Sequence, residues 1–394
     1  METRALLTRI GAIAFFVALA FSFLAPVPAS GEVLSNKSGC FLDLPEGFDY
    51  SDGDKQSRFS FADPNQGMEF DFFVYAPGRF KDRASLMAHI EGGLRSSGEK
   101  EGFIYEGREA AMMELDFSQD GALRKGWAIV VAGKPAKGQT PAEASYALLA
   151  WTDPDTLESY SDLMFSCLDG FSIDRAALRA PGPVSQYLLP FPAVRKETRK
   201  VKFGQTTLDV AFSKDEATRV EETAAREFRV LESYANHETL WKDAWARCYR
   251  LIFREASRRM DQFVSQIDPL LPADPTSVAR SLLAWVQDWK YERDSKGIDF
   301  VDPITAAVEG RGDCDSRAMV MSLILERRGI PSILMLSKDY SHAMAAVDVP
   351  GGGQRFTFDD KDWLVAETTA HVGIGLVAAN QADWKKWLGV RLGY

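Results

Sequence analysis

Residues 310–331 read GRGDCDSRAMVMSLILERRGIP, and this stretch decides the fold that the sequence predicts for the C-terminal half. Asp313 is a suitable N-cap, because its carboxylate can accept the backbone N–H groups of a first helical turn. Gly329 is typical of the residue just past a helix end, and Pro331 prevents the helix from continuing. The helix predicted over residues 314–328 is apolar on most sides, so we expect it to be central and buried.

Cys314 occupies the first turn of this helix. Unpaired N–H groups and the helix dipole favour a thiolate there, and the same N–H groups can help to hold an oxyanion. The carboxylates of Asp313 and Asp315 oppose ionisation, unless Asp313 points into the cap and Asp315 towards solvent or Arg317. Cys314 is therefore the candidate nucleophile. The alternative is a small buried cysteine or a disulfide with Cys248.

The segments after the helix supply the groups that a cysteine nucleophile requires. We expect strands over residues 333–336, 342–349, 354–358 and 363–368. His342 begins the second of these strands, and Glu367 lies near the end of the fourth. A thiol needs a nearby imidazole to take its proton, and the imidazole needs an acid or amide to fix its tautomer. We predict His342 as the base and Glu367 as the orienting acid, with His371 as a rival base.

Four short segments resemble bacterial transglutaminase-like proteins, a family with the papain fold. They are GDCD, GIP, SHAM and AETT, at residues 312–315, 329–331, 341–344 and 366–369. The resemblance is most specific over about residues 280–370. It implies a catalytic domain over residues 201–394, with the central helix packed on an antiparallel sheet. The family has Asp where Glu367 stands and Pro where Thr368 stands. Glu367 carries the same charge as Asp on a longer side chain.

The resemblance implies an exported thiol-dependent hydrolase of amide or isopeptide bonds, a cysteine peptidase or amidase. Its acyl-enzyme would form on Cys314, its substrate would be a protein or peptide, and it would need no cofactor. Release of the acyl group by an amine would instead make it a protein-crosslinking transamidase, and a non-catalytic binding module is a further alternative. The family often places a Gln, Asn or Trp at the oxyanion, for which Gln287 or Trp285 is the candidate. A surface glutamine and a core tryptophan fit the helical pattern equally well.

The segment before this core is predicted to be mainly helical. A strand is expected over residues 201–210, and helices over residues 215–234, 240–263 and 275–291. Tryptophans at helical spacing in the last two helices indicate a packed core. Residues 176–200 contain four scattered prolines, which predicts an extended linker.

Residues 32–175 are predicted to form an accessory α+β domain. Strands are expected over residues 58–61, 68–75, 103–105, 110–117, 123–132 and 145–151, and helices over residues 85–95 and 155–168. Helices that interrupt a mostly antiparallel run of strands suggest an α+β sandwich. This order, with LPEGF at residues 44–48, resembles PsbP/Mog1-like domains. No constellation of His, Cys or paired carboxylates occurs here, so an accessory or binding role is expected.

The N-terminus has the pattern of an export signal. A short basic segment precedes an apolar run over residues 11–24, and Val27 and Ala29 fit the small-residue pattern that a signal peptidase reads. We expect residues 1–29 to be cleaved, which leaves no membrane span and a periplasmic or secreted protein. An uncleaved N-terminal membrane anchor is the alternative.

Charge and cysteine content limit the partners. The net charge is −10 and no basic stripe stands out, which argues against nucleic acid. Four scattered histidines and the lack of CxxC or HExxH argue against zinc. Export permits disulfides, and if one forms, Cys40 and Cys167, near the two ends of the first folded segment, are the natural pair. Cys314 would then remain as a thiol.

Overall fold

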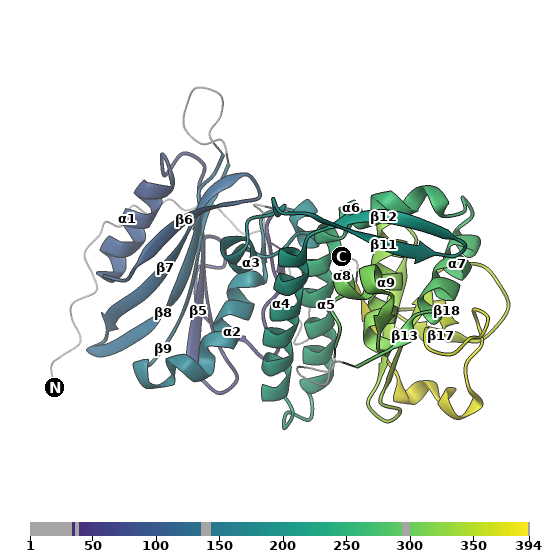
Figure 1. Ribbon diagram of the computed structural model, residues 1–394. Coiled ribbons are helices and arrows are strands. Elements are labelled where there is room, and N and C mark those ends of the chain that lie inside the picture. Colours follow the sequence, from purple (N-terminus) through teal and green to yellow (C-terminus); the bar gives the residue numbers. More distant parts are fainter. Residues whose placement is uncertain (1–33, 36–38, 135–142, 294–299, 393–394) are drawn as a thin grey trace, which may run out of the picture.

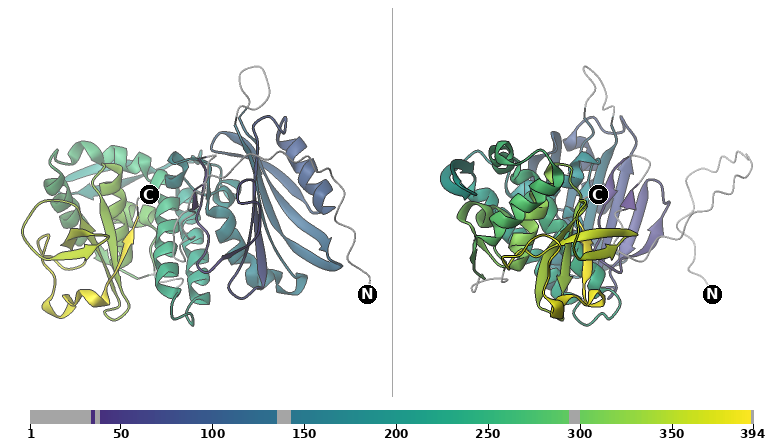
Figure 2. Two further views of the ribbon diagram at one scale, coloured as in Figure 1. Left: turned by 180° about the vertical axis from the view of Figure 1, so that it is seen from behind. Right: turned by 90° about the vertical axis from the view of Figure 1, so that its right-hand side faces the viewer.

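The computed structural model describes residues 34–35, 39–134, 143–293 and 300–392. Two antiparallel sheets dominate these residues, one of seven strands in the N-terminal half and one of five in the C-terminal half. Helices α4 (Lys214–Ser233) and α5 (Trp241–Arg259) pack side by side between the two sheets (Figure 1, Figure 2). This arrangement confirms the expected α+β class. The predicted signal peptide, residues 1–29, lies outside the described residues.

The larger sheet has the strand order β3-β4-β5-β9-β8-β7-β6, with every pair antiparallel. Its strands are β3 (Asp49–Gly53), β4 (Arg58–Ala62), β5 (Met68–Tyr75), β6 (Lys100–Tyr105), β7 (Arg108–Gln119), β8 (Ala122–Val131) and β9 (Ser145–Thr152). Side chains alternate between the faces of a strand, and both faces of this sheet are apolar. Helix α1 (Arg83–Leu94) covers one face and α2 (Leu157–Asp169) the other (Figure 1). The sequence pattern does not predict β3, because its residues, DYSDG, are mostly polar.

The extended linker predicted over residues 176–200 is wrong. The structure has a 3-10 turn η2 (Ala176–Arg179), the short helix α3 (Pro183–Leu188) and the start of β11 (Glu197–Phe203) in this stretch. Pro183 occupies the first helical turn, where its missing N–H costs nothing. Val184 is buried in the core of the larger sheet, so burial of apolar side chains holds the segment against the domain.

The segment between the two sheets also differs from prediction in two places. Residues 201–210 do not form one strand, because Gly204, with a φ of 57°, turns the chain between β11 and β12 (Thr206–Phe212). The helix predicted over residues 240–263 divides at Met260 into α5 and α6 (Asp261–Ile267). Helices α7 (Pro275–Gln287) and α8 (Pro303–Glu309) follow. Within the described residues, no helix combines the length and apolar character that crossing a lipid bilayer requires.

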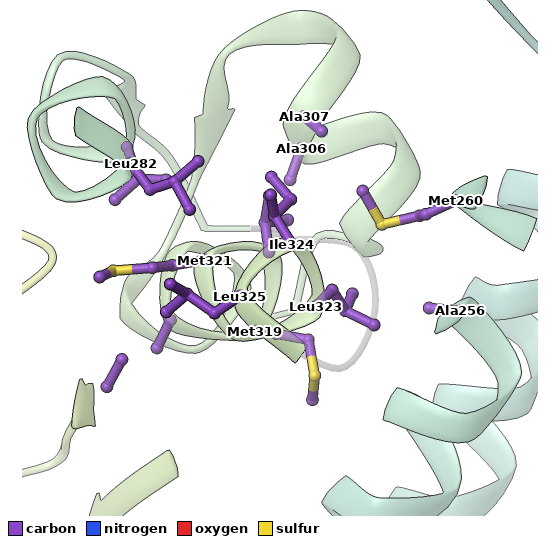
Figure 3. Packing of buried hydrophobic residues seen from close by; sticks show 14 of the residues in the cluster. Ala256, Met260, Leu282, Ala306, Ala307, Met319, Met321, Leu323, Ile324 and Leu325 are labelled. Atoms are coloured by element: carbon purple, nitrogen blue, oxygen red, sulfur yellow. The ribbon is translucent and has the colours of Figure 1, made fainter. Parts of the chain in front are cut away.

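The smaller sheet has the order β17-β18-β16-β15-β19, again with antiparallel pairs throughout. Its strands are β15 (Ser332–Ser337), β16 (His342–Val347), β17 (Arg355–Phe358), β18 (Lys361–Ala366) and β19 (Leu388–Arg391). Helix α9 (Cys314–Arg327) packs against one face, through β15 and β16. Figure 3 shows that its apolar side chains point in several directions, towards α5, α7 and α8. The central, buried helix that the sequence predicts is therefore present.

Short elements complete the fold. Strands β1 (Leu34–Ser35), β2 (Phe41–Leu42) and β10 (Phe171–Ser172) form a small sheet beside α2. The 3-10 helices η1 (Pro154–Thr156), η3 (Asp268–Leu270), η4 (Ala379–Gln381) and η5 (Trp384–Lys386) occur in connections. The disulfide that the sequence left open between Cys40 and Cys167 is not formed, although both side chains lie in the same core.

Buried charges join the two halves of the chain. Arg247 of α5 donates to Asp43 Oδ1 at 3.0 Å and to Ser166 Oγ at 2.7 Å, and Glu227 of α4 lies 3.5 Å from it. All four side chains are buried. Removing charges from water is costly, so such a contact depends on complete pairing of its members. The network therefore holds α4 and α5 in one orientation against the N-terminal domain.

We predict that Arg247→Ala lowers the free energy of unfolding by about 3 kcal/mol, because it breaks a buried ion-pair network and leaves Arg250 as the remaining cation on Asp43 and Arg226 on Glu227. The matched control is Arg229→Ala, which breaks an exposed pair with Asp162 and should cost less than about 1 kcal/mol. Urea unfolding of both variants measures the difference. Equal losses would contradict the role of the buried network.

Candidate active site

The loop that leads into α9 is held by pairing and capping. Strand β14 (Arg311–Gly312) pairs in parallel with β13 (Lys290–Tyr291). This pairing fixes the position of Gly312, the residue before the helix cap Asp313. A Cβ on Gly312 would lie 2.8 Å from Ser316 Cβ, so only glycine fits there. Asp313 caps the helix as predicted, because its Oδ1 accepts hydrogen bonds from Ser316 N at 2.9 Å and from Ser316 Oγ at 2.7 Å.

The cysteine is less exposed and less acidic than its position at a helix start predicts. The side chain of Cys314 is buried, and its thiol accepts the backbone N–H of Ala343. Burial, followed by the charges of Asp315 and Asp313, raises the pKa of the thiol to about 12. The expected thiolate is therefore wrong for the resting protein, because loss of hydration outweighs the helix N–H groups.

Asp315 points neither to solvent nor to Arg317, the two directions that would have limited its effect on the thiol. It hydrogen-bonds to the phenol of buried Tyr249 on α5. Burial raises the pKa of Tyr249 far above its usual range, and the Asp315 charge adds to this effect. The carboxylate next to the cysteine is thus fixed in place and adds to the cost of ionising the thiol.

His342 and Glu367 are brought together by the register of the sheet. Strand β16 lies between β15 and β18, with His342 at its start and Glu367 just past the end of β18. His342 Nε2 lies 2.7 Å from Glu367 Oε2. Because Nε2 is occupied by the carboxylate, Nδ1 is the nitrogen that can serve the thiol. The thiol lies next to this strand start, since its partner is Ala343, the residue after His342.

Glu367 is held as a carboxylate by several donors. Its Oε1 accepts hydrogen bonds from the backbone N and the hydroxyl of Thr369, at 2.7 and 2.5 Å. Burial acts to raise its pKa, but the hydrogen bond and charge of His342 and the bonds from Thr369 outweigh it, so that the pKa is lowered. The longer side chain is therefore compatible with the orienting role, although it departs from the family pattern in length.

Neither residue predicted at the oxyanion is free to serve there. Gln287 Nε2 donates to the carbonyl of Glu367 at 2.7 Å and to that of Val372 at 3.1 Å. Both hydrogens of its amide are thus engaged, and the side chain instead holds the segment after β18. Trp285 Nε1 donates to the carbonyl of Lys202 at 2.8 Å, and its ring packs on Phe203. Trp285 is therefore part of the core.

Arg317 is a further site residue, for which the sequence pattern predicts no role. Its guanidinium is buried and donates to the carbonyls of Trp289 at 2.6 Å and Gly312 at 3.1 Å, with that of Thr368 at 3.5 Å. It links the segments before Cys314, after α7 and after Glu367. Burial lowers its pKa, and negative charge on Tyr291, Asp313, Cys314 or Glu367 acts in the opposite direction. The signal in the sequence is an arginine three residues after the cysteine, near the start of a largely apolar helix.

The remaining candidates lie elsewhere. His371, the rival base, is exposed, and its Nδ1 is 3.8 Å from Asp288 Oδ1, so it faces a surface carboxylate. A cleft of about 460 Å³ is lined by Glu221, Asp302 and Arg311 among others, but not by the cysteine, His342 or Glu367. Among the described residues, no group of three or more His, Cys, Asp or Glu side chains has the geometry to hold a metal ion.

The chain has little detectable similarity to known proteins. Comparison with protein-family models gives no match, and comparison with curated proteins gives none. Among solved structures, PsbP from Synechocystis is similar at 14% identity and a TM-score of 0.29, over 38% of this chain and 97% of that chain. A crystal structure from Bacteroides thetaiotaomicron is similar at 8% identity and a TM-score of 0.25, over 82% and 88%. The likeness to PsbP is faint, and the resemblance of residues 280–370 to transglutaminase-like proteins stays a prediction.

We predict that Asp315→Asn speeds alkylation of Cys314 by iodoacetamide several-fold at a fixed pH, because it removes one charge that raises the pKa of the thiol. In the parent protein the rate should still rise with pH beyond pH 9. Asp360→Asn, at an exposed turn of the same domain, is the matched control and should change nothing. A rate that levels off near neutral pH would contradict the high pKa.

We predict that Glu367→Gln destabilises the protein at pH 7 by about 1–3 kcal/mol, the value of a hydrogen bond to a charged group. Because folding lowers the pKa of Glu367, its contribution is complete above the unfolded value of about 4.3 and is lost as the pH falls through the folded value. Urea unfolding at pH values stepped down from 7 should show the difference between the two proteins shrinking once the pH falls below about 4.3. The exposed Glu197→Gln is the control, and a difference in stability that does not shrink as the protein is acidified would argue against the assignment.

Proposed function

We propose that the chain is a thiol-dependent acyl-transfer enzyme that hydrolyses amide or isopeptide bonds, with Cys314 as nucleophile, His342 as base and Glu367 as orienting acid. The observation that supports it most is the 2.7 Å contact between His342 Nε2 and Glu367 Oε2, next to the strand residue whose N–H contacts the thiol. An imidazole with one nitrogen on a buried carboxylate and the other available is suited to accept a proton from a thiol.

The high pKa of the thiol determines how the first step would proceed. Cys314 would remain protonated until a substrate carbonyl arrives, and its proton would pass to His342 Nδ1 as the sulfur–carbon bond forms. Glu367 would stabilise the resulting imidazolium through Nε2. The oxyanion would lie at the first turn of α9, where backbone N–H groups lack helical partners. With Gln287 and Trp285 engaged elsewhere, backbone donors are the natural choice.

The same groups would complete the reaction. Collapse of the tetrahedral intermediate would expel the amine, which takes the proton from His342 Nδ1 and leaves a thioester on Cys314. Water would then attack the thioester while Nδ1 accepts its proton, and the acid product and the thiol would be released. Attack by an amine instead of water would give transamidation. Export, predicted from residues 1–29, would place this activity in the periplasm or outside the cell.

A non-catalytic binding module is the second candidate. The observation that favours it is the burial of Cys314, whose side chain is 4% exposed and whose pKa is raised to about 12. A buried, protonated cysteine can be a packing residue. The two readings differ in one respect, which is whether an acyl group can be transferred to the sulfur.

Acylation by 4-nitrophenyl acetate distinguishes them. We predict that intact-protein mass spectrometry shows one added acetyl group on the parent protein and none on Cys314→Ala. His342→Ala should slow acylation at least about 100-fold, since general base catalysis contributes 10²–10⁴. The matched control is His371→Ala, which removes an exposed histidine and should leave the rate within about twofold. Acetylation that is equally fast without His342, or that never occurs on Cys314, would overturn the enzymatic proposal.

A further inference from the structure

A groove of about 210 Å³ opens beside the candidate site, between the start of α5 and the edge of the smaller sheet. Its floor includes Leu336 of β15 and Leu388 of β19, which are paired in the sheet. Its walls carry three tryptophans and four lysines, against one aspartate. We call it the Lys–Trp groove, after its defining residues Trp241, Trp245, Trp387, Lys338, Lys385 and Lys386.

The groove is adjacent to the His342–Glu367 pair. The ring of Trp387 lies 6.1 Å from the imidazole of His342, nearly edge-on to it. Ser337, the last residue of β15, pairs directly with His342 at the same end of the sheet. Neighbouring strands lie about 5 Å apart, so the groove begins about 5–10 Å from the His342 strand. A polypeptide bound at the cysteine could therefore extend into the groove.

The lysines form a positive patch in an acidic protein. The chain carries a net charge of −10, yet within the described residues none of the groove lysines forms an ion pair. Other lysines do pair, as Lys361 does with Asp348 and Lys200 with Asp209. Unpaired charges of one sign, gathered at a concave surface, attract ligands of the opposite sign.

Aromatic rings hold three of these ammonium groups in position, and one of them is Lys242, whose Nζ lies 5.7 Å from the centre of the Trp241 ring. Lys338 Nζ lies 5.4 Å from the centre of the Trp241 ring, and Lys386 Nζ lies 5.3 Å from that of Tyr340. A cation over an aromatic face is attracted to it. Ordered lysines lose less conformational freedom when a ligand binds. The partly buried Trp241 and Trp245 add flat apolar surface beside them.

We propose that the Lys–Trp groove binds an acidic segment of the polypeptide whose amide bond is presented to Cys314. The lysines would contact glutamate or aspartate carboxylates, and the tryptophan faces would cover the aliphatic parts of these side chains and the peptide planes. This inference rests on the proposed function, because it names the substrate class of the same site. It also gives the acidic protein a means to select acidic substrates against its overall charge.

Binding to the Cys314→Ser protein tests the groove without turnover. The probe is a short fluorescein-labelled peptide that alternates glutamate with alanine, measured by fluorescence anisotropy at low salt against the same peptide with lysine in place of glutamate. We expect the acidic peptide to bind at least roughly tenfold more tightly, and the preference to fall with added salt. Reversal of two groove charges, Lys338→Glu with Lys386→Glu, should abolish the preference.

The matched control is Lys81→Glu with Lys134→Glu, which makes the same change in net charge at exposed positions of the N-terminal half and should leave binding within about twofold. Equal losses in both double variants, or no preference for the acidic peptide, would overturn the proposal. So would binding of polygalacturonate, an anionic glycan, by the groove without binding of the acidic peptide. Acetylation of Cys314 by 4-nitrophenyl acetate needs no peptide-binding site. The acetylation experiment therefore tests the thiol chemistry alone, and the peptide-binding experiment tests the groove alone.

Discussion

The burial of α9 on nearly every side is the constraint on which the C-terminal half depends. The helix packs on β15 and β16 and is covered by α5, α7 and α8 (Figure 3). A helix enclosed in this way cannot slide or rotate without opening cavities in a close-packed core. Its first residue, Cys314, is therefore fixed beside the start of β16. The same packing removes the thiol from water, so the feature that positions the cysteine also raises its pKa.

The site is a balance of opposed charges within this low-dielectric region. The charges of Asp313 and Asp315 disfavour a thiolate at Cys314. Arg317 lies close enough to Cys314 and Glu367 that negative charge on either of them favours its guanidinium cation. Arg317 is held by backbone carbonyls and not by a carboxylate, so its charge remains available to the site. A substrate that displaces water at the cysteine would lie close both to these charges and to the His342–Glu367 pair. In this way a resting thiol with a high pKa could still act as a nucleophile.

Local signals predicted those parts of the structure that local physics decides. Asp313 caps α9 as expected, because the cap needs only a carboxylate and the first helical turn. His342 and Glu367 meet because they lie at the same end of two neighbouring antiparallel strands, β16 and β18. The hairpin at Gly204 was signalled only by that glycine, and β19 is too short to show a periodicity. The roles of Gln287 and Arg317 depend on carbonyls distant in sequence, as the buried Arg247 network does on partners in the other half of the chain. No pattern in one segment reports contacts of that kind.

The most direct test of the central claim is a crystal structure of the protein trapped with an acidic peptide aldehyde. An aldehyde carbon captured by a nucleophilic thiol forms a hemithioacetal that mimics the tetrahedral intermediate of acyl transfer. We predict a covalent bond from Cys314 Sγ to that carbon, with His342 Nδ1 within hydrogen-bond distance of the adduct and Nε2 still on Glu367. An adduct on another residue, or an imidazole turned away from the sulfur, would contradict it.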